Sequence, residues 1–137
     1  MKNKIAIIAA GGGIAVRYDH LTGSILTAAS AAELNVAVPQ IANIADIEFV
    51  DFSNMPSSYM DIAQMYKLAK LVDEIALRED ISGIVITHGT DTMEETAYFL
   101  DLTVHTIKPV VLTGSMRPAT AISADGPLNL LEAVQAA

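Results

Sequence analysis

Cysteine is absent from this 137-residue chain, and basic residues are few. Without cysteine the chain can form neither disulfides nor thiolate metal sites, although its compartment stays open. Eight Lys and Arg residues stand against 16 Asp and Glu residues, which gives a formal net charge of −8. Nucleic acids and anionic membranes require basic patches, so neither is an expected partner. A small anionic substrate is still compatible with this charge, because a local helix dipole can outweigh a distant net charge.

Long apolar runs are also missing, and none reaches the roughly 20 residues that a membrane-spanning helix needs. The apolar run 5–10 follows two lysines and resembles a short signal peptide, but three glycines interrupt it at 11–13. We therefore predict a buried strand over residues 5–10. The expected localisation is cytoplasmic, with a periplasmic or secreted protein as the alternative.

What the chain does have is enough apolar sequence for a folded core: 52% of its residues are hydrophobic and 18% are charged. Its length suits one domain. The helical pattern that begins near Leu128 runs to Ala137 without a stop signal. We therefore expect residues 1–137 to be a single domain that is truncated at its C-terminal end, with no second domain present.

Short apolar runs alternate with helical patterns along the chain. Strands are predicted over 5–10, 47–52, 83–87 and 109–113, and helices over 30–37, 61–79, 91–102 and from 125 onward. Residues 17–27 predict a β-hairpin or flap. Continuously apolar strands alternating with helices indicate an α/β fold with a doubly wound, mostly parallel sheet flanked by helices, flavodoxin- or Rossmann-like.

The helix over 61–79 has the clearest pattern. Asp61 can cap it, with Gln64 three residues later, and Pro127 is well placed in the first turn of the helix after Asp125. The predicted buried stripe of the 61–79 helix recurs at helical spacing and consists of Ile62, Met65, Ala69, Val72 and Ala76.

Polar, Gly-rich segments follow all four predicted strands, at 10–13, 53–58, 87–92 and 113–118. Ligands of such folds bind beyond the carboxyl ends of the strands, so these segments are expected to converge on one site. The alternative is that they are ordinary loops, because polar, Gly-rich connections occur in every α/β protein.

The segment 83–93 carries the most specific pattern, in which a buried strand passes through a turn into a helix. Thr90 and Asp91 are thereby expected side by side at the helix N-terminus, where free N–H groups and the helix dipole favour an anion. Such a site suits a small substrate that bears a carboxylate. Alternatively, Thr90 or Asp91 is simply the N-cap of the helix.

Cofactor and metal motifs are not met. Gly11 and Gly13 lack the third glycine of a dinucleotide site, and no Gly-Lys-Ser/Thr sequence follows for phosphate binding. The histidines at 20, 88 and 105 lack metal-ligand spacing, and His88 is expected to support the turn. We therefore expect no cofactor and no metal.

Two segments resemble bacterial-type L-asparaginases: 88–97, which reads His-Gly-Thr-Asp-Thr-Met-Glu-Glu-Thr-Ala, and Gly-Ser-Met-Arg-Pro at 114–118, with Ser-Ala-Asp-Gly-Pro at 123–127. The similarity covers the whole chain but only the front part of the longer family sequence. It implies an N-terminal α/β domain of an enzyme that hydrolyses the side-chain amide of L-asparagine, often also of L-glutamine, and usually forms tetramers.

Carried over by position, Thr90 resembles the family's second active-site threonine, and Asp91 its partner acid, which also contacts the substrate α-amino group. Ser57 resembles the serine that binds the substrate α-carboxylate, and Ser58 its neighbour in substrate binding. The resemblance also implies a backbone contact at Gly89 and places Ser115 near the leaving amide.

The chain departs from the family at its first motif. Where the family has Thr-Gly-Gly-Thr-Ile-Ala, this chain has Ala10 at the first position and Gly13 at the nucleophile position, so the nucleophilic hydroxyl is missing. The flap tyrosine falls at Ser24, with Tyr18 nearby in the same flap. The lysine that pairs with the acid lies beyond residue 137 in relatives, and Lys108 precedes a strand and so belongs to the opposite rim.

These features lead to the hypothesis of an L-asparaginase-like amidohydrolase domain that is inactive or very slow as it stands. Its expected ligands are L-asparagine, L-aspartate and, as a further option, L-glutamine, and a homo-oligomer is expected. The alternative from another class is a non-catalytic domain that senses aspartate or asparagine. A third interpretation is a fragment without a function of its own.

Overall fold

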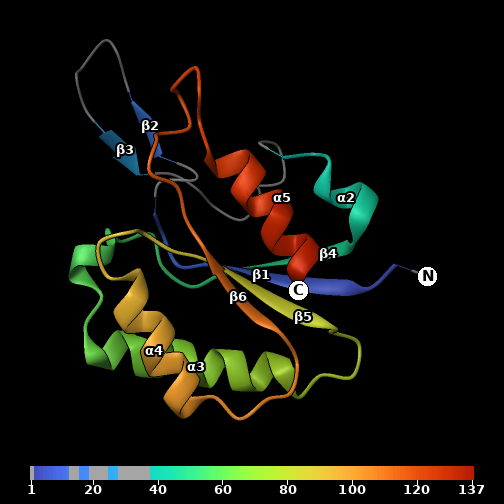
Figure 1. Cartoon of the computed structure of the whole chain (residues 1–137). Helices are drawn as coiled ribbons and strands as arrows, with labels where there is room; N and C mark the ends of the chain where they lie inside the picture. The colour runs from blue at the N-terminus through green and yellow to red at the C-terminus, as the bar shows by residue number, and fades with distance from the viewer. Residues whose placement is uncertain (1, 13–15, 19–24, 28–37) are drawn as a thin grey trace.

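The computed structural model describes residues 2–12, 16–18, 25–27 and 38–137. Its centre is a parallel sheet in the strand order β4-β1-β5-β6 (Figure 1). The strands are β1 (Lys4–Ala9), β4 (Asp46–Asp51), β5 (Gly83–Thr87) and β6 (Val110–Thr113). All four predicted strands are confirmed, each with boundaries within one residue of the expected ones.

Helices cover both faces of this sheet. One face carries α3 (Ile62–Ala76) and α4 (Met93–Thr103), and the other carries α5 (Gly126–Ala136) and the short α2 (Ile41–Ile44). Alternate residues of each central strand enter different apolar clusters: Ile84 and Ile86 pack toward α3 and α4, and Val85 packs toward α5. Because both faces are covered, these strands are apolar throughout, which confirms the predicted doubly wound α/β fold.

Two smaller elements complete the description. β2 (Val16–Tyr18) and β3 (Ile25–Thr27) pair antiparallel, which confirms a hairpin within 17–27, and a single 3₁₀ turn (η2) spans Ser57–Tyr59. The predicted helix over 30–37 lies outside the described residues. Among the described residues, no helix is both long and apolar enough to cross a bilayer.

The long helix α3 begins as predicted. The Asp61 side chain accepts a hydrogen bond from the Gln64 N–H at 2.8 Å. Four residues of the predicted stripe are buried, but Ile62 is 74% exposed, so its assignment to the core was wrong. Ile62 is the first residue of the helix and lies outside the apolar cluster, whereas Leu68 and Ile75 join the buried face.

The strand order has a direct consequence for ligand binding. From β1 the chain moves to β4 on one side, and then returns to β5 and β6 on the other side. The order reverses between β1 and β5, and doubly wound sheets bind ligands at the carboxyl ends of the strands at such a switch point. The segments that start at Ala10 and at His88 leave the sheet at this position.

The opposite end of the strands carries a cluster of ion pairs. Arg78 pairs with Glu48 through both guanidinium nitrogens, one of them at 2.8 Å, and with Asp80 at 2.9 Å. The Lys4 Nζ lies 2.9 Å from both carboxylates. Chiefly the hydrogen bond from Arg78, and then that from Lys4, lowers the pKa of Glu48 from 4.5 to about 2.

This cluster predicts an acid dependence of stability. The pKa of Glu48 is lower in the folded chain than in the unfolded chain, so its contribution is complete above pH 4.5 and disappears as the pH falls toward 2. We expect Glu48→Gln to lose about 1 kcal/mol of unfolding free energy at pH 7, as partly exposed ion pairs do, and to show a flatter pH dependence between 4.5 and 2. Urea unfolding across this range measures both. Parallel pH profiles for the two proteins would contradict this assignment.

Candidate functional site

The polar segments after β1, β4 and β5 meet at the carboxyl end of the sheet because glycines allow close approach between them. Gly12 has a φ of +96°, and a Cβ atom there would overlap the carbonyl of His88. A Cβ atom on Gly89 would overlap the side chain of Ser57. At both positions any other residue would force the segments apart.

His88 lies at the centre of this contact and is fully buried. Its Nδ1 lies 2.7 Å from the Gly89 carbonyl oxygen, and its Nε2 lies 3.0 Å from the Thr96 hydroxyl. Because a carbonyl can only accept, Nδ1 carries the proton and, in the neutral ring, Nε2 accepts from Thr96. The ring thus ties the turn after β5 to helix α4, as expected for a histidine that supports the turn.

Ser57 joins the same turn from the other side. Its hydroxyl accepts a hydrogen bond from the Asp91 N–H at 3.2 Å, and its carbonyl accepts one from the Thr92 hydroxyl at 2.8 Å. Ser57 is buried, whereas Thr90 and Asp91 are exposed beside it. Residues that are more than 30 positions apart in the sequence therefore form one polar edge with its hydroxyl and carboxylate open to solvent.

The helix start differs from the sequence prediction. Helix α4 begins at Met93, Thr92 is its N-cap residue, and no side chain caps it. The expectation that the helix starts at Asp91 was therefore wrong, and so was the alternative that Thr90 or Asp91 is its N-cap. The reason is tertiary: the Thr92 hydroxyl is bonded to Ser57, and the turn is held by that contact instead of by a cap.

The helix terminus also has a particular charge. Glu94 and Glu95 already stand in the first turn of α4, where they interact favourably with the helix dipole. An anionic ligand gains correspondingly less from this terminus. The N–H and hydroxyl groups of the turn are therefore more important for ligand binding than the dipole is.

The segment after β6 adds a buried hydroxyl. Ser115 is 6% exposed, and its Oγ has no hydrogen-bond partner among the described residues. Its loop is held by Asp125, whose carboxylate accepts the N–H groups of Met116 and Arg117, both at 2.9 Å. These two N–H groups, Met116 first, lower the pKa of Asp125. A buried hydroxyl without a protein partner is available to a ligand.

The remaining predicted positions are placed as follows. Ser58 is exposed in η2, next to Ser57. Tyr18 belongs to β2, but its side chain lies outside the described residues, as do Gly13 and Ser24. The Lys108 Nζ donates to the Arg78 carbonyl at 2.5 Å, at the ion-pair end of the strands, which confirms that it belongs to the opposite rim.

Sequence reasoning missed the residues that support the site. Thr92 and Thr96 were recognised only as part of a motif, and Asn129, whose amide donates to the Gly114 carbonyl at 2.9 Å, was not singled out. Their signal is weak, because each acts through a partner that is distant in the sequence. No group of three or more possible metal ligands occurs in the described parts of the chain.

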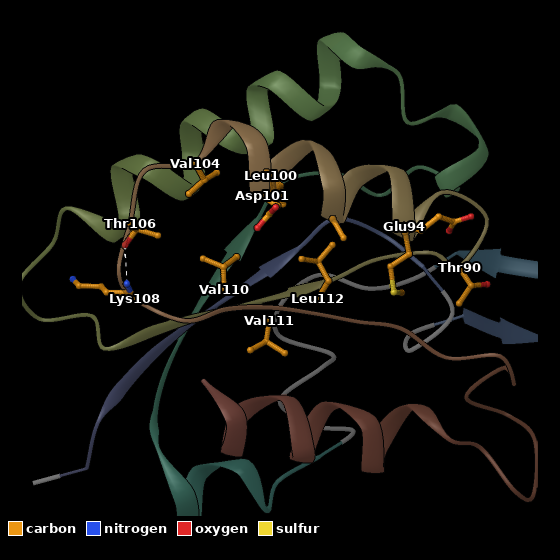
Figure 2. A pocket seen from close by; sticks show the side chains of 12 residues that line it. Thr90, Glu94, Leu100, Asp101, Val104, Thr106, Lys108, Val110, Val111 and Leu112 are labelled. Atoms are coloured by element: carbon orange, nitrogen blue, oxygen red, sulfur yellow. Dashed lines mark hydrogen bonds between the residues drawn. The ribbon is translucent and has the colours of Figure 1, made fainter.

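An open groove of about 900 Å³ lies between α4 and β6 (Figure 2). It includes Thr90 at one end, but neither Ser57 nor Asp91 lines it. Its walls are mostly apolar, from Met93 to Val104 on the helix and from Val110 to Leu112 on the strand. The groove is therefore distinct from the polar edge around Ser57.

Comparison with known proteins connects this arrangement to a family. The family model described as asparaginase, N-terminal, matches residues 4–137. The chain is 46% identical over 136 residues to a glutaminase-asparaginase of Acinetobacter glutaminasificans, covering 97% of this chain and 41% of the relative. It is 47% identical to L-asparaginase 2 of Bacillus subtilis, covering 97% of this chain and 36% of that one.

A solved structure has the same fold. The probable cytoplasmic L-asparaginase of Campylobacter jejuni superimposes with a TM-score of 0.89 at 51% identity, covering 97% of this chain and 41% of that one. The chain thus spans about two fifths of the length of the relatives it matches. With its parallel sheet and the polar edge at its switch point, this chain belongs to the asparaginase family and corresponds to its N-terminal domain.

Proposed function

We propose that this chain carries the amino-acid-binding part of an L-asparaginase-type site, and that it hydrolyses L-asparagine to L-aspartate and ammonia very slowly or not at all. The observation that supports this most is the contact of Ser57 with the turn that holds Thr90 and Asp91, joined by hydrogen bonds of 3.2 and 2.8 Å. L-Glutamine is a second substrate to test, since one relative is a glutaminase-asparaginase.

The binding role follows from the groups present. The free carboxylate of Asp91 suits an α-ammonium group, and hydroxyl and N–H donors around Ser57 suit an α-carboxylate. The buried Ser115 hydroxyl offers a further contact for a side-chain amide. Small polar ligands are oriented by such a small number of fixed groups.

The peptide between Gly89 and Thr90 adds one donor. The His88 ring holds the Gly89 carbonyl inward at 2.7 Å. Because a trans peptide sets its carbonyl and N–H groups antiparallel, the Thr90 N–H must point the opposite way. His88 therefore acts on a ligand through the turn and is a positioning residue.

Fewer of the groups that catalysis needs are present than of those that binding needs. Amide hydrolysis through a covalent intermediate needs a nucleophile, a base that activates it, and donors for the developing oxyanion. The nucleophile position is Gly13, and Lys108 is engaged at the far end of the strands. Gly13 also favours the second candidate function, a domain that senses aspartate or asparagine without turnover. We further propose a cytoplasmic homo-oligomer, in line with the compartment of the Campylobacter relative.

The first prediction from the proposed function concerns turnover. We expect ammonia release from L-asparagine at background level for this chain, and a rise of about tenfold or more in the Gly13→Thr, Ala10→Thr variant, because a missing member of a cooperating set limits the rate. A coupled ammonia assay with L-asparagine and L-glutamine measures both. The single Ala10→Thr variant is the control and should stay at background. Turnover by the unchanged chain at the rate of the double variant would contradict the assignment.

The second prediction concerns binding. Asp91→Asn should raise the Kd for L-aspartate at least about tenfold, because a charge-assisted hydrogen bond contributes about 1.5–3 kcal/mol. Asp101→Asn makes the same change at an exposed position near the other end of α4 and should leave the Kd unchanged. Titration calorimetry with L-aspartate measures the Kd of the unchanged chain and of both variants. Absence of saturable heat for the unchanged chain at millimolar aspartate would support the fragment without a function of its own.

The third prediction separates positioning from packing at His88. An asparagine can replace the Nδ1 donor to Gly89, whereas a glutamine can replace Nε2 toward Thr96. Both substitutions leave one buried group unpaired, so both should lower the unfolding free energy by about 1–3 kcal/mol. Aspartate affinity should nevertheless fall much more in His88→Gln than in His88→Asn. Equal losses of affinity would mean that His88 acts only through stability, which urea unfolding measures in parallel.

A further inference from the structure

The loop 114–125 joins β6 to α5 and closes on itself (Figure 1). The Asp125 carboxylate at its end accepts the N–H groups of Met116 and Arg117 near its start, both at 2.9 Å. The Arg117 guanidinium donates to the Ser123 carbonyl at 2.9 Å and joins the two sides of the loop a second time. Polar contacts within the loop therefore contribute strongly to its shape.

Asp125 binds this loop instead of its own helix. It is the N-cap residue of α5, and aspartate is among the preferred N-caps, yet its side chain makes no capping hydrogen bond. Pro127 in the first turn has no N–H group to offer to a cap. The carboxylate is thereby left for the loop, as the Thr92 hydroxyl is left for Ser57.

Two contacts from the start of α5 fix how the peptides around Ser115 are turned. The Asn129 amide donates to the Gly114 carbonyl at 2.9 Å. The next peptide is held by its N–H group, which Met116 donates to the Asp125 carboxylate. Because a trans peptide sets its carbonyl and N–H groups antiparallel, the Ser115 carbonyl of that peptide points away from Asp125.

The same segment lies against the turn that holds Thr90. A Cβ atom on Gly114 would overlap the His88 carbonyl oxygen at 2.6 Å and would touch the Thr90 methyl group at 3.4 Å. Ser115 is buried beside this contact, and its hydroxyl has no partner among the described residues. Residues 114 and 115 thus lie at the polar edge, and their peptides are held in one direction by the start of α5.

We propose that Asp125 is a positioning residue through which the site selects an amide over a carboxylate at the end of the ligand's side chain. The Ser115 carbonyl, held in place by Asp125, accepts a hydrogen bond from the side-chain NH₂ group of L-asparagine. L-Aspartate has a carboxylate at that end, which offers no donor when ionised, so two acceptors would face each other. This selectivity rests on the proposed amino-acid-binding role, in which Asp91 and Ser57 hold the other end of the ligand.

L-Asparagine and L-aspartate differ only in this group, so the ratio of their Kd values tests it. Asp125→Asn keeps the size of the side chain but replaces one acceptor by a donor, so one of the two loop N–H groups loses its bond. We expect the Kd for L-asparagine to rise about fivefold and the Kd for L-aspartate to change less than about twofold, as for the loss of one hydrogen bond between neutral groups. Titration calorimetry with both ligands measures the ratio.

Asp61→Asn is the matched control. The Asp61 carboxylate also accepts a backbone N–H group, that of Gln64 at the start of α3, so the same substitution is made at a similar contact. Both Kd values should stay unchanged in this variant.

A second variant makes the test independent of how well Asp125→Asn folds. Asn129→Leu removes the donor to the Gly114 carbonyl at similar size and should shift the ratio in the same direction. Urea unfolding records the stability of each variant in parallel. Equal losses of affinity for the two ligands would mean that Asp125 acts only through stability, and a larger loss for L-aspartate would mean that it serves another end of the ligand. Either result overturns the proposal.

Failure of the proposed function gives a different result. If neither ligand produces saturable heat with the unchanged chain at millimolar concentration, the amino-acid-binding role is wrong and this selectivity is wrong with it. If both ligands bind, and Asp91→Asn weakens both while Asp125→Asn leaves their ratio unchanged, only the role of Asp125 is overturned.

Discussion

The site depends on one close approach, in which backbone from β1, β5 and η2 packs around the peptide between His88 and Gly89. Gly12 lies against the His88 carbonyl and Gly89 lies against Ser57, at distances that leave no room for a side chain. The His88 ring fills the interior side of this contact and binds the Gly89 carbonyl and the Thr96 hydroxyl. Because the ring and the glycines hold the turn from behind, Thr90 and Asp91 can stay exposed in front.

The two ends of the sheet carry different kinds of side chain. At the amino ends of the strands, long charged side chains such as Arg78 and Glu48 pair with one another across three segments. At the carboxyl ends, short hydroxyl side chains and glycines bring backbone groups to the surface. The charged groups of the ion pairs are one another's partners, whereas exposed hydroxyl and N–H groups at a switch point are free to bind a ligand. This contrast explains why Lys108 cannot serve the polar edge.

Membership in the asparaginase family favours binding of the family's ligands, whereas the glycine at position 13 argues against covalent catalysis. The family relation is shown by the match over residues 4–137 and by the fold. Binding uses several groups, each of which contributes a modest share. Covalent catalysis requires a nucleophile, and other members of a cooperating set do not compensate for its absence. A site can therefore keep its ligand while its chemistry is lost, and our proposal rests on this difference.

Local pattern was enough for the strands, the three long helices and the cap at Asp61, because apolar periodicity and capping act over a few residues. It also placed Thr90 and Asp91 next to each other in the turn after β5, at the carboxyl end of the sheet. The tertiary structure alone decided that helix α4 starts at Met93, that Thr92 bonds to Ser57 instead of capping, and that Ile62 is exposed. It also decided which tautomer His88 adopts. Each of these depends on a partner that lies far away in the sequence, and periodicity carries no information about such partners.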